Sequence, residues 1–397
     1  MYLFNPENDL ALAHFTANYT PPASANRMTE ELAILPIWYA GMDRRTFGRN
    51  NKEAVVIAEG ELNHSFLASI KKILPLHASL IPFSDIALYP HLKIVPWGWN
   101  PTLRKKLVSY GANEEVLPSP EELICLRHYS SRKHAVEILS ELKTEEAGVC
   151  GESHFFTDTE ELYNWLESSP GNKVLKMPLS GSGKGLIWIL GGITDKQCDW
   201  CRRVVREQGG VVAEPVLSKV QDFAMEFYLH EGKADFAGYS LFRTAASGAY
   251  TGNELLSDAR IEEKLGKFAS IELLHRLRYS IEEKLSHRFP LYTGYAGVDM
   301  MVCETSCGYR IQPCVEINMR MNMGLVARFF HERYMHPGGE GKFVVDYFKK
   351  PESALSFNEK MQRESPLKVE NGKILSGYLS LTPVTKTTSY VAYVNVF

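Results

Sequence analysis

Asp299 and the run from residue 316 to residue 320 (EINMR) carry the side chains of this 397-residue chain that are best suited to chemistry. Successive side chains of a strand point to opposite faces, so Glu316, Asn318 and Arg320 share one face if this run is a strand. The other face is apolar. Two carboxylates, an amide and a guanidinium are therefore expected to point toward one place.

The run 297–302 before it alternates in the same way and predicts a second strand, with Cys307-Gly308 as a hairpin turn between the two. If the strands fold symmetrically about that turn, Asp299 lies opposite Glu316. Facing carboxylates repel each other, so we expect a divalent cation between them, and oxygen ligands favour Mg²⁺ or Mn²⁺ over zinc. The alternative is a solvated strand face with ordinary charges.

A glycine-rich loop lies further upstream, between a strand predicted to begin at Lys173 and another over 186–190. Its residues are Ser180, Gly181, Ser182, Gly183, Lys184 and Gly185. Glycine accepts the backbone angles that let N–H groups surround phosphate oxygens. The Walker loop and the dinucleotide fingerprint both lead into a helix, and this loop leads into a strand. A plain hairpin turn is the alternative interpretation.

Two acids follow a helix predicted over 195–208. Glu214 precedes Pro215, which interrupts a strand as an edge or hinge proline does. Asp222 begins an alternating strand on whose opposite face Phe223 lies. Acids in a hinge after a phosphate loop are candidates for binding ribose hydroxyls, and surface acids on a half-exposed strand are the alternative.

Composition excludes several classes of protein. The net charge of −3, with 45% hydrophobic and 23% charged residues, predicts a soluble globular protein without the basic surface that nucleic acid requires. The first residues resemble no signal peptide and no apolar run is long enough to span a bilayer, so we expect a cytoplasmic protein that binds no membrane. Seven cysteines, an odd number, argue against a disulfide framework, and Cys198 and Cys201 lie in a helical run without the strand that a redox site needs.

The order of predicted elements divides the chain into parts. Short buried strands alternate with helices in the first third, at 1–4, 54–58 and 92–96, which predicts an α/β layer. The predicted parts are an N-terminal α/β domain on the acceptor side (1–143), a small subdomain with the glycine-rich loop (144–213), a subdomain with the metal site (214–345) and a C-terminal extension (346–397).

Three segments allow more than one interpretation. The cluster 5–9 follows the first strand and either helps to bind an acceptor or caps a helix through Asp9. The polar run 243–253 is a candidate lid or substrate loop. The extension 346–397 either packs on the core or forms a contact in a homodimer.

These pieces in this order resemble the ATP-grasp superfamily over residues 133–324. The resemblance implies two small subdomains with antiparallel sheets that clasp ATP, preceded by an α/β domain that helps to hold the acceptor. The fold class is therefore expected to be α/β and α+β. Two departures are the proline after Glu214 and the lack of a substrate signature in the first 130 residues.

The resemblance also implies roles for single residues. Lys176 is expected at the α- and β-phosphates, and the loop 180–185 is expected to close over the β- and γ-phosphates. Glu214 is similar to the hinge residue beside the adenine, and Asp222 to the acid that holds the ribose.

Further roles concern the metal and the moving phosphoryl group. Asp299, Glu316 and Asn318 match the magnesium ligands, and Arg320 matches the arginine near the transferred group. Lys133 matches a second phosphate-binding lysine, with Arg132 as an equal candidate.

A family of this kind implies an ATP-dependent carboxylate-amine ligase that forms an acyl phosphate and releases ADP and phosphate. ATP with Mg²⁺ or Mn²⁺ would be its cofactors, Lys176 and Arg320 its catalytic residues, and small-molecule or peptide carboxylates and amines its substrates. An ATP-dependent small-molecule kinase on the same fold and a nucleotide-binding protein without catalysis are the alternatives.

Overall fold

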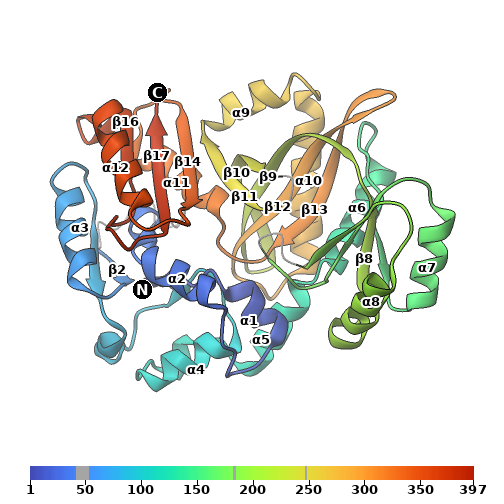
Figure 1. The fold of residues 1–397 in the computed structure, drawn as a ribbon, viewed down its shortest axis with the longest axis horizontal. Helices are drawn as coiled ribbons and strands as arrows, with labels where there is room; N and C mark the ends of the chain where they lie inside the picture. The colour runs from blue at the N-terminus through green and yellow to red at the C-terminus, as the bar shows by residue number, and fades with distance from the viewer. Residues whose placement is uncertain (42–52, 182–184, 246–247) are drawn as a thin grey trace. The chain divides into compact units, whose positions relative to one another are not determined.

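The computed structural model describes residues 1–41, 53–181, 185–245 and 248–397, which form two compact units (Figure 1). Unit 1 consists of Met1–Ile124, Thr251–Asp258 and Met321–Phe397, and unit 2 of Cys125–Tyr250 and Ala259–Arg320. The four-part division expected from the sequence stays a prediction.

Unit 1 contains a parallel sheet built from the first 100 residues. Its strands lie in the order β3 (Ala78–Ile81), β2 (Ala54–Ile57), β1 (Tyr2–Leu3) and β4 (Val95–Pro96). The three strands predicted in this region are confirmed, and β3 was not predicted because its run ASLI is too short and too mixed to stand out. Short apolar strands of this kind suit a parallel sheet that is buried on both faces.

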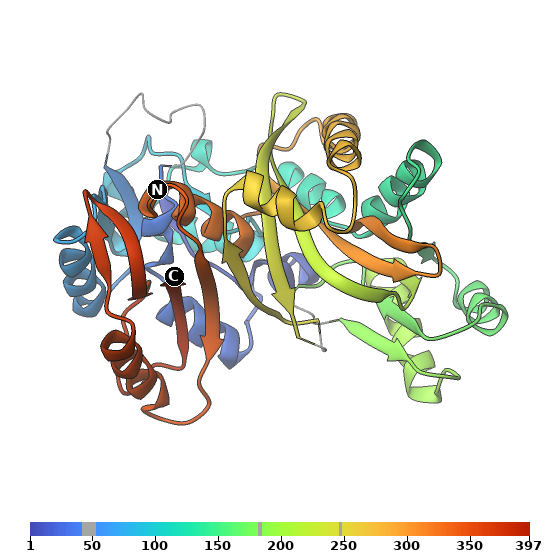
Figure 2. The same ribbon diagram turned by 90° about the horizontal axis from the view of Figure 1, so that it is seen from above.

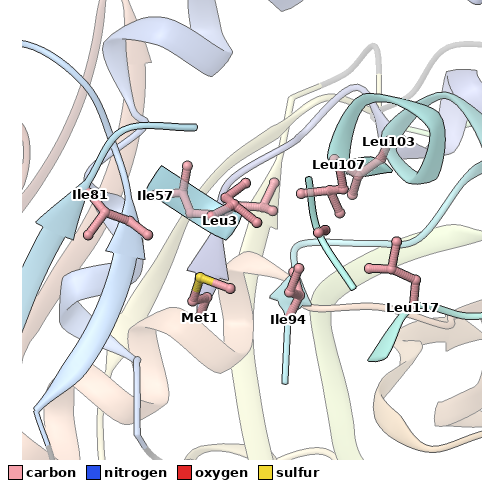
Figure 3. Packing of buried hydrophobic residues seen from close by; sticks show 10 residues of the cluster. Met1, Leu3, Ile57, Ile81, Ile94, Leu103, Leu107 and Leu117 are labelled. Atoms are coloured by element: carbon pink, nitrogen blue, oxygen red, sulfur yellow. The ribbon is translucent and has the colours of Figure 1, made fainter. Parts of the chain in front are cut away.

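The core beside this sheet is made of aliphatic side chains from β1, β2 and β3, from Ile94 just before β4, and from the helix that follows β4 (Figure 3). That helix, α4 (Pro101–Ser109), starts at Asn100, whose side-chain oxygen accepts a hydrogen bond from the backbone N–H of Leu103 at 2.9 Å. Leu103 and Leu107 of α4 pack with Leu3. The other helical segments of the region are α1 (Asn8–His14), α2 (Ala23–Glu31), η1 (Leu35–Trp38), α3 (Glu61–Lys71), η2 (Phe83–Leu88) and η3 (Glu114–Val116).

The C-terminal part of the chain adds a second, antiparallel sheet to unit 1. Its strand order is β11 (Tyr250–Leu255), β14 (Gly341–Tyr347), β17 (Tyr390–Val396), β16 (Lys373–Ser380) and β15 (Lys368–Glu370). The helices α11 (Met323–Tyr334) and α12 (Ser353–Glu364) belong to the same part. The indole N–H of Trp38 donates to the carbonyl oxygen of Leu381 at 2.7 Å, so the end of the chain packs on its beginning.

Unit 2 contains two antiparallel sheets. The strands of the larger one lie in the order β13 (Gly308–Asn318), β12 (Gly294–Thr305), β9 (Ser218–His230) and β10 (Lys233–Thr244). Helix α10 (Ile271–Arg288) packs on β9, β10 and α6 (Lys133–Glu145). The smaller sheet has the order β5 (His154–Phe156), β8 (Val211–Pro215), β6 (Lys173–Lys176) and β7 (Leu186–Ile189). Figure 2 shows the β12–β13 hairpin, drawn in orange, from above.

Two helices cover the smaller sheet, α7 (Thr159–Ser168) and α8 (Asp195–Gln208). The bounds predicted for α8 are confirmed, because the sequence marks both of its ends. Thr194 and Gln197 form a capping box, and Gly209 adopts a left-handed conformation (φ 80°) after the last turn. The remaining helices are α5 (Pro120–Tyr129) and α9 (Asp258–Leu265).

The run 243–253 is not the loop that the sequence suggested. Strand β10 continues to Thr244 and β11 begins at Tyr250, so most of this run belongs to strands and only a short connection separates them, of which residues 246–247 are outside the described part. Within the described ranges no helix combines the length and the apolar character that crossing a bilayer requires.

Candidate active site

Asp299 lies directly opposite Glu316 in the β12–β13 hairpin, as predicted, but for a different reason. The turn is one residue earlier than expected, because Thr305 pairs with Gly308. The ladder is regular from there to the pair Met301 and Gln312. Between this pair and Asp299–Glu316, β12 has one residue and β13 has three. This β-bulge restores the predicted pairing.

A chain of hydrogen bonds joins the polar residues of this hairpin. The side-chain amide of Asn318 donates to Asp299 Oδ2 at 3.0 Å, and Arg320 Nη2 donates to Asn318 Oδ1 at 3.0 Å. Strand β13 ends at Asn318, so the prediction that Arg320 lies in the strand is wrong. A turn, in which the backbone N–H of Arg320 bonds the carbonyl oxygen of Asn318 at 2.9 Å, brings the guanidinium back to the same group.

The charges around Asp299 are unfavourable for a second negative group. Burial raises the pKa of Asp299 well above its usual range, and the neighbouring carboxylates of Glu316 and Glu226 raise it further, against the opposing effect of Asn318 and Arg320. A divalent cation would relieve this repulsion. In the described part of the chain no three His, Cys, Asp or Glu side chains form a metal-binding group. That Asp299, Glu316 and the amide oxygen of Asn318 hold Mg²⁺ stays a prediction.

Glu226 is a buried acid of the same sheet face that the sequence reasoning did not select. It is only 1% exposed and lies opposite Gly297 on β12, which in turn pairs with Asn318 on β13. Its position two residues from Ala224, the neighbour of Asp299, puts it on the polar face. The alternation from Asp222 to Glu226 was the available signal. Its burial depends on the pairing of β9 with β12, which the sequence does not show.

Arg132 connects Glu316 with the segment that leads into the glycine-rich loop. Its Nη2 donates to Glu316 Oε1 at 2.6 Å, and its Nη1 donates to the carbonyl oxygen of Met177 and to Ser180 Oγ, both at 2.7 Å. The neighbouring Lys133 has a side chain that is 51% exposed and pairs with Glu137 at 3.9 Å. Arg132 thus contacts Glu316 and Ser180 directly, and which of the two residues contacts phosphate stays a prediction.

Lys176 and Glu214 form a buried ion pair in the smaller sheet. Lys176 Nζ lies 2.7 Å from Glu214 Oε2, each side chain is 9% exposed, and Ser153 Oγ donates to the other oxygen of Glu214 at 3.0 Å. Burial raises the pKa of the nearby Cys314 thiol, the charges of Asp299 and Glu214 raise it further, and that of Lys176 lowers it.

The loop 180–185 is described only at its ends, since Ser182, Gly183 and Lys184 lie outside the described residues. The backbone N–H of Met177 donates to the carbonyl oxygen of Gly185 at 2.9 Å and closes the base of the loop. Gly185 has φ +76°, and a Cβ there would lie 2.8 Å from Ser180 Cβ, so glycine is required. The Gln208 amide accepts from the backbone N–H of Leu179 at 2.8 Å and donates to its carbonyl oxygen at 3.2 Å, which holds the chain just before Ser180.

Asp222 lies on the same strand face but makes its own set of contacts. Lys219 Nζ lies 2.7 Å from Asp222 Oδ2, and Thr244 Oγ1 donates to the same oxygen at 2.7 Å. Its partner on β12 is Met301, two residues along from Asp299. The structure thus brings Arg132, Asp299, Glu316, Asn318 and Arg320 into one connected group, with Asp222 further along the same sheet.

No protein-family model matches the chain, and no curated protein matches it. Solved structures do. The biotin carboxylase of Campylobacter jejuni, in a complex with β,γ-ATP, is 12% identical, with 100% of this chain and 87% of that chain covered and a TM-score of 0.53. An N5-carboxyaminoimidazole synthetase of Staphylococcus aureus with ADP is 12% identical over 87% of each chain, with a TM-score of 0.48. The corresponding ribonucleotide synthetase of Thermus thermophilus is 10% identical over 86% of this chain and 87% of that one, with a TM-score of 0.48.

The likeness to biotin carboxylase concerns the fold, which this chain shares over its whole length. The fold class predicted from the sequence is confirmed, with a parallel sheet in the N-terminal part and antiparallel sheets in the part that follows.

Proposed function

We propose that this protein is an ATP-dependent ligase that activates a carboxylate as an acyl phosphate and joins it to an amine or a similar nucleophile. The observation that carries the proposal is the connected group of Asp299, Glu316, Asn318, Arg320 and Arg132 beside the base of a glycine-rich loop. Such a group offers both cationic donors for phosphate oxygens and anionic ligands for the magnesium that accompanies ATP. The ATP-grasp fold supports the same conclusion.

The reaction needs no protein nucleophile. A carboxylate oxygen of the substrate attacks the γ-phosphorus, the bond from that phosphorus to the β-γ bridging oxygen breaks, and ADP leaves. The amine then attacks the acyl carbon, the bond between this carbon and the phosphate oxygen breaks, and phosphate leaves as the nitrogen loses a proton. Catalysis is therefore positioning and charge stabilisation.

The residues of this chain divide that work. Arg320 stabilises the charge that develops on the transferred phosphoryl group. Lys176 binds the phosphates of ATP while it also contacts Glu214. Arg132 takes the second phosphate-binding role, since its Nε–H is buried and no hydrogen-bond partner for it exists in the described part of the chain. Asp299, Glu316 and Asn318 would hold Mg²⁺ or Mn²⁺, which when bound neutralises charge on the β- and γ-phosphates.

The nucleoside part of ATP is assigned to the hinge side of unit 2. Glu214 and the backbone that follows it lie beside the adenine, and Asp222 holds the ribose hydroxyls. The segment 180–185, of which residues 182–184 lie outside the described part of the chain, is assigned to the β- and γ-phosphates.

The experiment is a screen of amino acids, short peptides and dicarboxylates with Mg-ATP, scored for ADP and free phosphate. We expect ADP and phosphate in equal amounts when the right carboxylate and amine are both present. ADP with a stable phosphorylated product and no free phosphate would instead identify a kinase, and ATP binding without ADP release would identify a nucleotide-binding protein.

The matched variants for this screen lie on one hairpin. Glu316→Ala removes a proposed metal ligand, and we expect kcat to fall by more than about 100-fold, which corresponds to about 3 kcal/mol of transition-state stabilisation. Glu304→Ala removes an exposed acid near the turn of the same hairpin and should leave kcat unchanged. A fully active Glu316→Ala protein would contradict the assignment.

A homodimer through the C-terminal strands of unit 1 is part of the proposal. The rings of Tyr347 and Tyr390 are tilted by 42° with centroids 4.9 Å apart, and Tyr347 and Phe397 are 52% and 65% exposed. Light scattering after size-exclusion chromatography distinguishes a dimer from a monomer.

A further inference from the structure

The bulge of β13 determines which residue of β12 lies opposite Glu316. A regular ladder continued from the turn would pair Cys314 with Asp299, and Glu316 with Gly297. Instead, β13 has two extra residues, and Glu316 pairs with Asp299. Two strand residues correspond to about 7 Å. Side chains keep their face under a shift of two, so both arrangements are compatible with the apolar pattern of the strand.

Only the observed pairing of Glu316 with Asp299 brings the two carboxylates close enough to bind one metal ion. Oxygen atoms that bind one Mg²⁺ each lie about 2.1 Å from it and hence within about 4 Å of each other. With Glu316 displaced by about 7 Å along the strand, the backbone would place its carboxylate too far from that of Asp299 for both to bind one metal ion. The register of this hairpin therefore decides whether the two acids can act together.

The regular register would be more favourable for the backbone hydrogen bonds of Cys314, and the observed register must compensate for their loss. The regular register would give the backbone N–H and C=O of Cys314 partners on β12, and this residue is only 2% exposed. A buried backbone group without a hydrogen bond costs about 1–3 kcal/mol. Pro313 has no N–H to contribute and interrupts the ladder at the same point.

The side chain of Gln312 supplies both of these bonds within β13 itself. Its Oε1 accepts from the backbone N–H of Cys314 at 2.7 Å, and its Nε2 donates to the carbonyl oxygen of Cys314 at 3.2 Å. Gln312 is 1% exposed. Gly151 packs against it, with φ +104°, and a Cβ at Gly151 would lie 2.7 Å from Gln312 Cγ.

We propose that Gln312 is a positioning residue of the site: its carboxamide replaces the ladder bonds of Cys314 and so holds the bulge that sets Glu316 opposite Asp299. This inference rests on the proposed function for its meaning in catalysis. The structural part of the inference does not depend on the substrate, since it concerns how Asp299 and Glu316 are brought together.

The test uses the full chain with Gln312→Met, which keeps the length of the side chain and its packing on Gly151 while removing both hydrogen bonds. Mn²⁺ binding in the presence of ATP is measured by the loss of the electron paramagnetic resonance signal of free Mn²⁺, a readout that needs no acceptor. We expect the dissociation constant to rise at least tenfold, with the Mg²⁺ concentration for half-maximal ADP release rising in parallel.

A matched control separates positioning from general loss of stability. Asn358→Ala removes a buried carboxamide of unit 1, which accepts from the Tyr378 hydroxyl at 3.0 Å. It should lower the unfolding temperature and leave Mn²⁺ binding unchanged. If Gln312→Met does not fold, Gln312→Glu decides, because it keeps the acceptor for the Cys314 N–H, and we expect a rise of severalfold.

The outcomes are distinct. Unchanged Mn²⁺ binding in the folded Gln312 variant overturns the inference and leaves the proposed function intact. A wild-type protein that binds no Mn²⁺ with ATP overturns the proposed function. Weaker binding in Gln312→Met together with unchanged binding in Asn358→Ala supports the inference.

Discussion

Two buried carboxamides, one in each unit, make the same pair of hydrogen bonds with different consequences. In unit 1 the Asn5 amide donates to the carbonyl oxygen of Gly98 at 2.9 Å and accepts from its N–H at 3.3 Å. In unit 2 the Gln312 amide does the same with Cys314. The first joins residues 93 positions apart, and the second joins residues two positions apart.

The difference lies in what each pair of bonds fixes. Asn5 and Gly98 follow the ends of β1 and β4, so their bonds extend the contact between two strands that are already paired. Gln312 holds an irregularity inside one strand, next to acids that repel each other. The same chemistry therefore stabilises the fold in unit 1 and sets the register of charged groups in unit 2.

The largest effect that this comparison predicts is on stability in unit 1. Asn5→Ala leaves the backbone N–H and C=O of Gly98 without the amide, and we expect a loss of about 3 kcal/mol in the free energy of unfolding. Denaturant titration measures it, with Asn18→Ala as an exposed control. Mn²⁺ binding with ATP should not change. A change in Mn²⁺ binding as large as that in Gln312→Met would end the distinction between the two amides.

A smaller effect is expected from the charged network of unit 2. Arg132→Met leaves Glu316 beside Asp299 without its guanidinium partner. Because the Glu316 side chain is 26% exposed, water screens part of the charge, and we expect a loss of about 2 kcal/mol without metal.

A double-mutant cycle shows whether this loss comes from the ion pair. In a Glu316→Gln background the cost of Arg132→Met should fall by about 1 kcal/mol, since no carboxylate is left uncompensated. Purely additive losses in denaturant titrations would mean that the guanidinium stabilises the fold through its other contacts, such as the hydrogen bonds to Met177 and Ser180, and not through Glu316.

The smallest effect is a pH dependence in unit 1. Burial raises the pKa of Glu7, against an opposing hydrogen bond from Thr29 Oγ1 to Glu7 Oε2 at 3.0 Å. The stability that the protonated group contributes is complete below the unfolded pKa of about 4.3 and is lost as pH rises through the higher folded pKa. Glu7→Gln removes this loss, so the variant should be more stable than the wild type by about 1 kcal/mol at pH 7.5.

Unfolding titrations at pH 4 and pH 7.5 test the sign. The advantage of Glu7→Gln should shrink at the lower pH and should not depend on Mg²⁺, which separates it from the acids of unit 2. An advantage of equal size at both pH values would assign it to something other than ionisation.

Local patterns carried most of the secondary structure and the types of the site residues. The capping signals of α8 sit in adjacent residues, so its bounds follow from short-range chemistry. The alternation around Asp299 and Glu316 gave their common face for the same reason. Strand β3 was missed because four mixed residues carry little periodic signal.

Pairings between distant segments were beyond such patterns. The burial of Glu226 follows from the pairing of β9 with β12, and the contact of Arg132 with Glu316 joins residues 184 positions apart. The polar run 243–253 was misread as a loop because composition alone does not reveal that strands continue through it.

The sequence by itself determined that Asp299, Glu316 and Asn318 share a strand face, since period two is a property of the backbone and needs no partner. The tertiary structure decided that the two acids meet, through a turn one residue earlier than expected and a bulge that compensates for it. A shift of two residues preserves every face, so the pattern of apolar residues cannot distinguish the two registers. The two registers are distinguished by contacts of the folded chain. These are the local hydrogen bonds of Gln312 with Cys314 and the long-range ion pair of Glu316 with Arg132.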